Sequence, residues 1–185
     1  MVTLAGLWLP ILLAAVIVFV ASSIMHMLLK YHQGDYRKLP DEDKVVGVLR
    51  GAGLTRGLYH FPFTTHKEMK SPEVQAKFKE GPVGFITVMP SGPVNMGKFL
   101  GLWFAYCIVV GIVVAYLAAH MVTAGAPYRH VFRVVGTAAF LAYSVGPLIN
   151  GIWKGQPWSM VIKEAIDGLV YALLTAGTFG WLWPR

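Results

Sequence analysis

The chain has 185 residues, of which 56% are hydrophobic and 14% are charged, and its formal net charge is +7 at pH 7. This composition excludes an ordinary soluble globular domain and is typical of an integral membrane protein. The basic charge could indicate a nucleic-acid partner, but the aromatic and basic residues form no recognised nucleic-acid-binding motif, so we expect none. The single cysteine, Cys107, excludes a disulfide framework and a thiolate metal cluster.

Residues 7–29 form the first long apolar run, with Pro10 in its first turn, where a missing amide donor does little harm. A cleaved signal peptide is the alternative interpretation. The run, however, follows no basic segment and is longer than the apolar region of a typical signal peptide. We therefore expect an uncleaved membrane helix within residues 1–29.

Residues 30–97 make up the only sizeable polar region, and we expect them to form an extramembrane loop. Pro40, followed by acidic residues, predicts a helix that ends near Gly51 and lies along the membrane surface. Ser71, followed by proline and glutamate, predicts a second helix, because serine caps helix N-termini and proline favours the first helical position. Gly81 is the expected end of this second helix.

Two runs of β-forming residues lie in the same region, at residues 58–63 and 85–89, and could pair as strands. Pro62 would confine the first strand to a sheet edge, because proline donates no hydrogen bond. Lysines are also frequent here and could attract anionic lipid, at about 1 kcal/mol per charge near the surface. They alternate with glutamates, which favours a solvated face instead. These lysines are Lys67, Lys70, Lys77 and Lys79.

Three further apolar runs follow at residues 98–120, 131–149 and 158–183, joined by short connections rich in glycine, proline and polar residues. Small residues spaced by four allow helix backbones to approach closely inside a membrane. These rows are Gly97, Gly101 and Ala105; Gly111, Ala115 and Ala119; Ala138, Ala142 and Gly146; and Gly168, Ala172, Ala176 and Gly180.

The predicted fold class is an all-α membrane protein with four transmembrane helices in a compact bundle. Residues 1–29 supply the first helix and residues 98–185 supply the other three, so that the chain forms a single membrane domain overall. The intervening residues 30–97 are expected to form a cytoplasmic loop of about two short helices and possible short β-strands.

Positive charge near the ends of the four runs indicates their orientation, since cytoplasmic ends carry more lysine and arginine. The ends on the side of the long loop are richer in these residues than the opposite ends. We therefore expect the long loop in the cytoplasm and both termini outside. The two sets are Lys30, Arg37, Lys38, Lys98, Lys154 and Lys163 against Arg129, Arg133 and Arg185.

Two acidic residues, Glu164 and Asp167, lie three residues apart on one face of the last run, and Tyr171 continues their polar stripe. An ionisable group at this depth is costly and indicates a functional site or a buried charge pair that fixes helix register. The charge pair is the favoured interpretation, and a proton or cation relay is the alternative. The expected neighbours on the cytoplasmic side are His26, Lys30, Lys98, Asn150 and Lys163.

The histidines raise the question of a haem or metal site, because His26 and His32 lie close together in the sequence. His26 and His120 end their runs on opposite sides of the membrane, so they cannot be axial ligands of one haem. His60 and His66 show no recognised ligand spacing. We therefore predict no metal, no resident cofactor and no catalytic residue, and leave open a cofactor acquired through a partner.

Four stretches resemble a family of small four-helix bacterial inner-membrane proteins classed as hypothetical. They read YHQGDYRKLPDEDKV, KEMKSPE, GPVGFITVMPSGPVNMGK and DGLVYALLTAGTFGWLWP. The stretch NGIWKGQPW, before the last run, is similar more loosely to a broader group with a domain of unknown function and four helices. The resemblance covers nearly the whole chain. It implies the bacterial inner (plasma) membrane as the location, so that the two outside termini would lie in the periplasm. It also implies the four-helix layout, but no activity or catalytic residue.

We expect a non-enzymatic membrane protein that acts as an accessory or structural subunit of a larger complex, or as a homo-oligomer. Abundant packing rows on few helices and a small loop favour this function. The expected partners are the lipid bilayer and other membrane-protein subunits or a second copy. The alternative is a small proton, ion or solute transporter that uses Glu164 and Asp167. An enzyme or haem carrier is the least favoured hypothesis.

Overall fold

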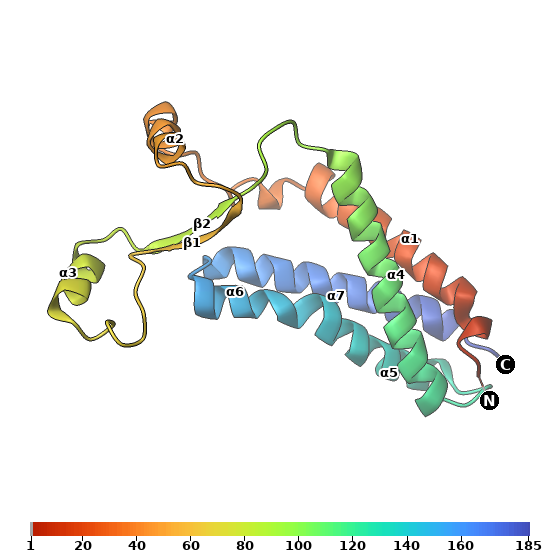
Figure 1. Ribbon diagram of the computed structural model, residues 1–185. Coiled ribbons are helices and arrows are strands. Elements are labelled where there is room, and N and C mark those ends of the chain that lie inside the picture. The colour runs from red at the N-terminus through yellow and green to blue at the C-terminus, as the bar shows by residue number, and fades with distance from the viewer. Residues whose placement is uncertain (1) are drawn as a thin grey trace. The chain divides into compact units, whose positions relative to one another are not determined.

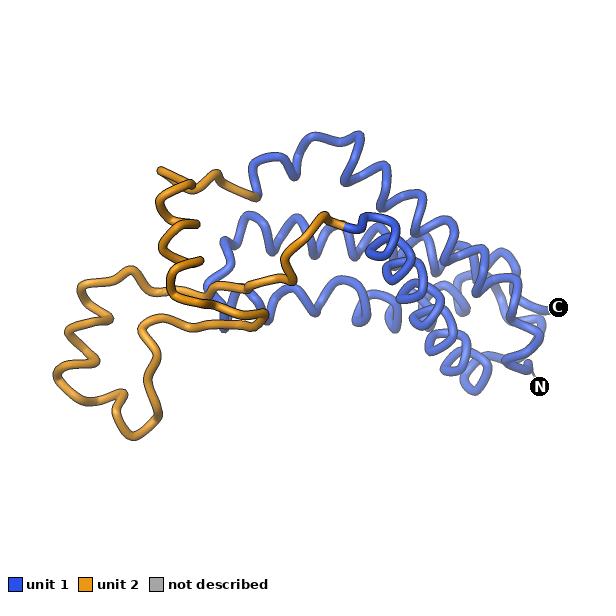
Figure 2. The backbone as a smooth tube through the Cα atoms, turned by 45° about the horizontal axis from the view of Figure 1, so that its top comes forward, with its two compact units in different colours: residues 1–35, 95–185 blue, residues 36–94 orange. Residues whose placement is uncertain are grey.

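The computed structural model describes residues 2–185 and is mostly helical, at 67%. Contacts divide the chain into two compact units, Met1–Asp35 with Asn95–Arg185, and Tyr36–Val94 (Figure 2). The first unit holds the long apolar helices, and the second holds two short helices and a two-stranded sheet. The polar middle of the chain therefore has structure of its own.

The first unit is built from helices in the apolar runs, two of which contain a π-helical turn. One π turn ends the N-terminal helix, and the other interrupts the third apolar run. π turns are frequent at functional sites. The elements are η1 (Ala5–Leu7), α1 (Trp8–Ser23), η2 (Ile24–Leu28), η3 (Lys30–His32), α4 (Met96–Met121), α5 (Tyr128–Phe140), η4 (Leu141–Val145), α6 (Gly146–Lys154) and α7 (Trp158–Trp181) (Figure 1).

Within residues 2–185, three continuous helical segments are long and apolar enough to cross a membrane, namely Ala5–Leu28, Met96–Met121 and Tyr128–Lys154. They correspond to the first three predicted runs and support a membrane protein. α7 matches the fourth run in position and has 24 residues, but it carries Lys163, Glu164 and Asp167 in its first three turns. With these charges, α7 is not among the helices that are apolar enough to cross a membrane, so the prediction of four transmembrane helices is not confirmed.

α7 lies at the centre of the first unit, where it packs against α1, α5 and η4, while α4 packs against α1 and α5. The small-residue row of α7 faces these neighbours. At Gly168, an added Cβ would lie 2.3 Å from the main-chain oxygen of Tyr143, so only glycine permits the approach of η4. At Gly180, an added Cβ would likewise lie 2.7 Å from ring atoms of Tyr128.

The other predicted rows have mixed outcomes. Gly111 and Ala115 are buried in α4, and an added Cβ on Gly111 would lie 3.2 Å from Ile11 Cγ2. The row of Gly97, Gly101 and Ala105 is exposed, as are Ala142 and Gly146. Only some of the rows that allow close approach are therefore covered by helices of this chain. Spacing by four marks a stripe on a helix but does not say whether another helix covers it.

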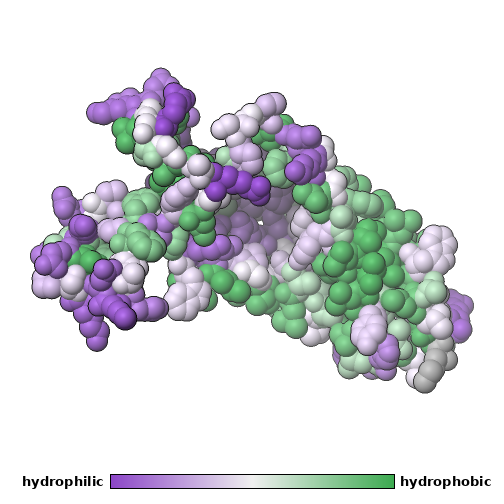
Figure 3. Space-filling view, viewed as in Figure 1, coloured by the Kyte–Doolittle hydropathy of each residue, from purple (hydrophilic) through white to green (hydrophobic). Residues whose placement is uncertain are grey.

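The outward face of the apolar helices carries large hydrophobic side chains. On α4, Val109 is 55% exposed and Val113 is 60% exposed. Figure 3 shows hydrophobic residues gathered over the part of the molecule that contains α4. A hydrophobic surface of this extent is typical of contact with lipid, because a soluble chain rarely exposes large apolar patches.

The second unit contains α2 (Glu42–Gly51), β1 (Gly57–Phe61), α3 (Pro72–Glu80) and β2 (Gly84–Val88). β1 and β2 pair antiparallel, with Tyr59 opposite Ile86, which confirms the predicted strand pair. The predicted cap of α3 is also confirmed, because Ser71 Oγ accepts a hydrogen bond from the Val74 amide at 3.3 Å. Pro62 follows the last residue of β1, where its missing donor leaves the ladder intact.

The close approach at Gly168 predicts a position-specific loss of stability. Gly168→Ala places a Cβ against the main chain of η4, and we expect the free energy of unfolding to fall by about 1–3 kcal/mol, as for other overpacked sites. Gly177→Ala is the matched control on the same helix, because its Cβ would meet Tyr128 Oη at an ordinary 3.6 Å. Thermal unfolding in detergent should give a lower Tm for Gly168→Ala than for the wild type and Gly177→Ala. Equal Tm values for the two variants would contradict the close packing of η4 at Gly168.

Candidate functional site

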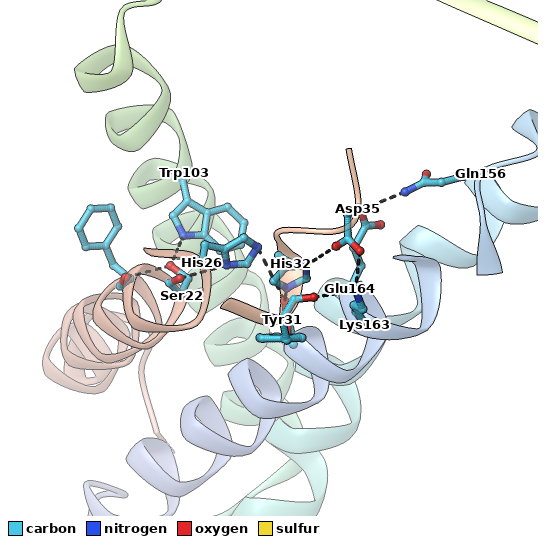
Figure 4. A network of polar contacts seen from close by, with 11 residues as sticks. Ser22, His26, Tyr31, His32, Asp35, Trp103, Gln156, Lys163 and Glu164 are labelled. Atoms are coloured by element: carbon cyan, nitrogen blue, oxygen red, sulfur yellow. Dashed lines mark hydrogen bonds and ion pairs between the residues drawn. The ribbon is translucent and has the colours of Figure 1, made fainter. Parts of the chain in front are cut away.

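The end of the N-terminal helix turns the chain toward α7. The π turn η2 ends at Leu28, and Leu29 adopts an extended conformation, with φ −82° and ψ 120°, which stops the helix. The single turn η3 follows and brings Tyr31 and His32 into contact with α7. Figure 4 shows these side chains where the N-terminal segment meets α7.

Asp167 is the buried carboxylate of the site, with 2% of its surface exposed. The Tyr31 hydroxyl donates a hydrogen bond to Asp167 Oδ1, and His32 Nε2 lies 2.7 Å from Asp167 Oδ2. His26 Nε2 lies 3.7 Å from the same Oδ2. A buried carboxylate requires such partners, because desolvating an unpaired charge costs several kcal/mol. Asp167 therefore holds the segment after α1 against α7.

His32 connects Asp167 to a second carboxylate, Asp35. The Nδ1 atom of His32 lies 2.6 Å from Asp35 Oδ2, and Lys163 Nζ donates to Asp35 Oδ1 at 2.6 Å. Lys163 also donates to the main-chain oxygen of Tyr31 at 2.7 Å. The Asp35 side chain is 4% exposed and that of Lys163 is 29% exposed. A chain of alternating charges thus runs from buried Asp167 to partly exposed Lys163.

These contacts shift the pKa values of the groups that lie outside the membrane helices. Hydrogen bonds and charge from Lys163 and His32 lower the pKa of Asp35, so its carboxyl is ionised at neutral pH. Burial lowers the pKa of His32, but hydrogen bonds and charge from Asp35 and Asp167 outweigh burial, and the net pKa is raised. Burial, together with the hydrogen bond and charge of Asp167, raises the pKa of Tyr31 and keeps it a neutral donor.

A cavity of about 710 Å³ lies beside Asp167, between the end of the N-terminal helix, the start of α4, and α7. Its volume falls in the range of ~300–1,000 Å³ that is usual for small-molecule sites. Tyr171 is 4% exposed, and within residues 2–185 its hydroxyl has no hydrogen-bond partner. The lining residues are Ser22, Ser23, His26, Met27, Met96, Leu100, Trp103, Tyr106, Tyr143, Pro147, Glu164, Asp167 and Tyr171.

Aromatic side chains from three segments form one wall of this cavity. Trp103 stacks on Tyr106 with ring centroids 5.5 Å apart, and Tyr143 meets Tyr171 edge to face at 5.8 Å. Hydrogen bonds fix two of these rings, because Trp103 Nε1 donates to Ser22 Oγ at 2.8 Å and Tyr106 donates to a main-chain oxygen of η4 at 2.9 Å. The wall is therefore held in place before any ligand binds.

The structure brings together some of the residues that the sequence singled out and leaves others apart. Asp167, Tyr171, His26 and Glu164 line one cavity. Glu164 also accepts a hydrogen bond from Gln156 at 3.1 Å. The two remaining candidates lie outside the cavity lining: Lys98 is exposed, and Asn150 is half-buried in the middle of α6.

The sequence did not predict three residues of the polar network around Asp167, of which Tyr31 and His32 contact Asp167 and Asp35 contacts His32. Tyr31 and Asp35 were not considered as partners, and His32 was considered only for a haem or metal site. Lys163, expected beside Asp167, binds Asp35 instead. One available signal was the spacing of His32 and Asp35, because residues three apart can contact each other within one turn.

Comparison of the chain with protein-family models finds no matching family, and comparisons with curated proteins and with solved structures find no match either. The resemblance to small four-helix membrane proteins therefore stays a prediction. The function is inferred from the geometry of the site.

The contacts of Asp167 predict that the two acidic residues of α7 differ in their effect on stability. Asp167→Ala leaves Tyr31 and His32 without their shared acceptor, and we expect the free energy of unfolding to fall by about 3–5 kcal/mol. Glu164→Ala removes a carboxylate from the same helix face but only a contact with Gln156, so we expect a change within about 1 kcal/mol. Unfolding in detergent, followed by tryptophan fluorescence, measures both. Equal losses would contradict the anchoring role of Asp167.

Proposed function

We propose that the protein is a multi-pass membrane protein that binds an amphipathic, lipid-soluble small molecule in the 710 Å³ cavity. The observation that carries this proposal is the Tyr171 hydroxyl, which is buried among apolar walls and has no partner within residues 2–185. Leaving a buried polar group unpaired costs about 1–3 kcal/mol. The hydroxyl oxygen is closed off from the cavity, so a ligand whose polar head accepts this hydrogen bond removes that cost once the Tyr171 side chain shifts to expose it.

The lining of the cavity indicates the chemistry of this ligand. Leu100, Met96 and the aromatic wall are suited to a hydrocarbon or ring-bearing body. At the polar end, Tyr171 offers a donor, whereas the carboxyl groups of Glu164 and Asp167 disfavour an anionic head. A hydroxyl-bearing head fits this combination, because it accepts from Tyr171 and can donate to a carboxylate.

We place this site in a four-helix membrane bundle, with α7 as the fourth span. The burial of Asp167 supports this placement, because its charge faces protein partners and not lipid. The distribution of lysine and arginine supports an orientation with Tyr36–Val94 in the cytoplasm and both termini outside. The bacterial inner membrane as the location is supported by the sequence resemblance alone. The accessory-subunit or homo-oligomer function and the alternative of a transporter stay predictions.

Photolabelling tests the ligand-binding proposal. The probe is a long-chain alcohol that carries a diazirine, added to the detergent-solubilised protein and located by peptide mass spectrometry. We expect labelling of cavity-lining peptides that excess unlabelled alcohol suppresses. Leu100→Trp fills the cavity and should reduce specific labelling by about tenfold or more, a loss of at least ~1.4 kcal/mol. Leu102→Trp, a leucine of the same helix that lies outside the cavity lining, is the control.

Specific labelling that is equal in the two tryptophan variants, or that excess alcohol does not suppress, would contradict the proposal. Tyr171→Phe gives a second readout. The variant removes a buried hydroxyl that has no partner, so the ligand-free protein should keep its stability or gain up to about 1–3 kcal/mol. Its specific labelling should nevertheless fall. A large loss of stability would show that the hydroxyl already has a partner.

A further inference from the structure

Two imidazoles and one carboxylate converge beside the cavity. One ligand atom from each of His26, His32 and Asp167 lies within 4.8 Å of the other two. His26 belongs to η2, His32 to η3 and Asp167 to α7, so three separate elements supply the set. Imidazole nitrogen and carboxylate oxygen together are a common donor set for divalent first-row transition metals.

The outer contacts of the two histidines use the same ring atom in each, Nδ1, and leave Nε2 on the side of Asp167. The Nδ1 atom of His26 lies 3.0 Å from the main-chain oxygen of Ser22, and Nδ1 of His32 lies 2.6 Å from Asp35 Oδ2. Both partners can only accept, so each Nδ1 carries a proton, and Nε2 is the atom that lies near Asp167, at 2.7 Å in His32 and 3.7 Å in His26. Metal-binding histidines show this pattern, in which the second nitrogen donates to a carbonyl or carboxylate.

The carboxylate has a matching arrangement. Tyr31 donates to Asp167 Oδ1, while Asp167 Oδ2 lies 2.7 Å from His32 Nε2 and 3.7 Å from His26 Nε2. Asp35 is held in turn by Lys163 at 2.6 Å. Every potential ligand therefore has one atom tied by an outer hydrogen bond and a second atom close to those of the other two. The rings of His26 and His32 stack with centroids 4.5 Å apart and planes 12° apart, so one ring must rotate before both Nε2 atoms face the same point (Figure 4).

We propose that His26, His32 and Asp167 bind a divalent first-row transition metal ion, of which Zn²⁺ is a representative. Metal–ligand bonds of about 2.0–2.1 Å place ligand atoms ~3.3 Å apart in a tetrahedral site. The His26 side chain is 52% exposed, so its ring is free to make the small approach that closes the set. The proton shared by His32 Nε2 and Asp167 Oδ2 leaves to solvent as the metal binds.

Three protein ligands leave a fourth coordination position for water or another molecule, as in catalytic zinc sites. Two of the three ligands, His26 and Asp167, also line the 710 Å³ cavity, so a molecule in the cavity lies next to the site. The metal site itself depends only on side chains of this chain. It stands whether or not the cavity binds an amphipathic molecule.

Zinc titration of the untagged, detergent-solubilised protein tests the proposal after treatment with EDTA and removal of the chelator. Calorimetry should give one site per chain, and bound Co²⁺ should report nitrogen ligands in its visible spectrum. We expect His26→Gln and His32→Gln to weaken Zn²⁺ binding by at least tenfold. Asp35→Asn, which alters the contact behind His32 and removes the ion pair with Lys163 but no ligand atom, should weaken Zn²⁺ binding by about 10–100-fold.

His120→Gln is the matched control. The Nδ1 atom of His120 likewise lies 2.7 Å from a main-chain oxygen, that of Tyr116, but this histidine lies outside the cluster. Zinc affinity should be unchanged in this variant. His26→Gln keeps the test decisive if His32→Gln unfolds, because the His26 side chain is 52% exposed. The proposal is overturned if the folded wild-type protein binds no Zn²⁺, or if His26→Gln binds it as tightly as His120→Gln does.

Discussion

The burial of one carboxylate, that of Asp167, determines how the rest of the first unit is arranged at this end. A carboxylate with 2% exposure must be paired, because an unpaired buried charge is too costly to keep. Its partners Tyr31 and His32 lie just beyond the N-terminal helix, so that helix has to stop and the chain has to turn. The extended residue Leu29 makes that turn.

Gly168, the residue after Asp167 in α7, determines how closely η4 approaches the opposite side of the site. Gly168 lets the main chain of η4 approach to a distance that any Cβ would prevent, so Tyr143 and Ser144 lie next to the residue that follows Asp167. Polar pairing on one side and backbone packing on the other position α7 between the N-terminal segment and η4. The cavity lies at this junction, with Tyr171 one turn further along α7.

Local patterns in the sequence predicted the elements but not the contacts of the site. Hydropathy located the apolar helices, and the Ser71 cap located α3, because both depend on residues close together in the chain. The partner of Asp167 could not be found in this way, since His32 lies 135 residues away. The rows at Gly97 and Gly111 share one spacing, yet only the second is buried, because tertiary packing decides which stripe a helix covers.

A double-mutant cycle between His32 and Asp167 tests most directly whether this contact anchors the segment after α1. The free energies of unfolding of wild type, His32→Gln, Asp167→Asn and the double variant would be measured in the same detergent. The two side chains are in contact, so the account predicts a coupling energy of about 0.5–3 kcal/mol between them. Losses that simply add, with no coupling, would contradict it.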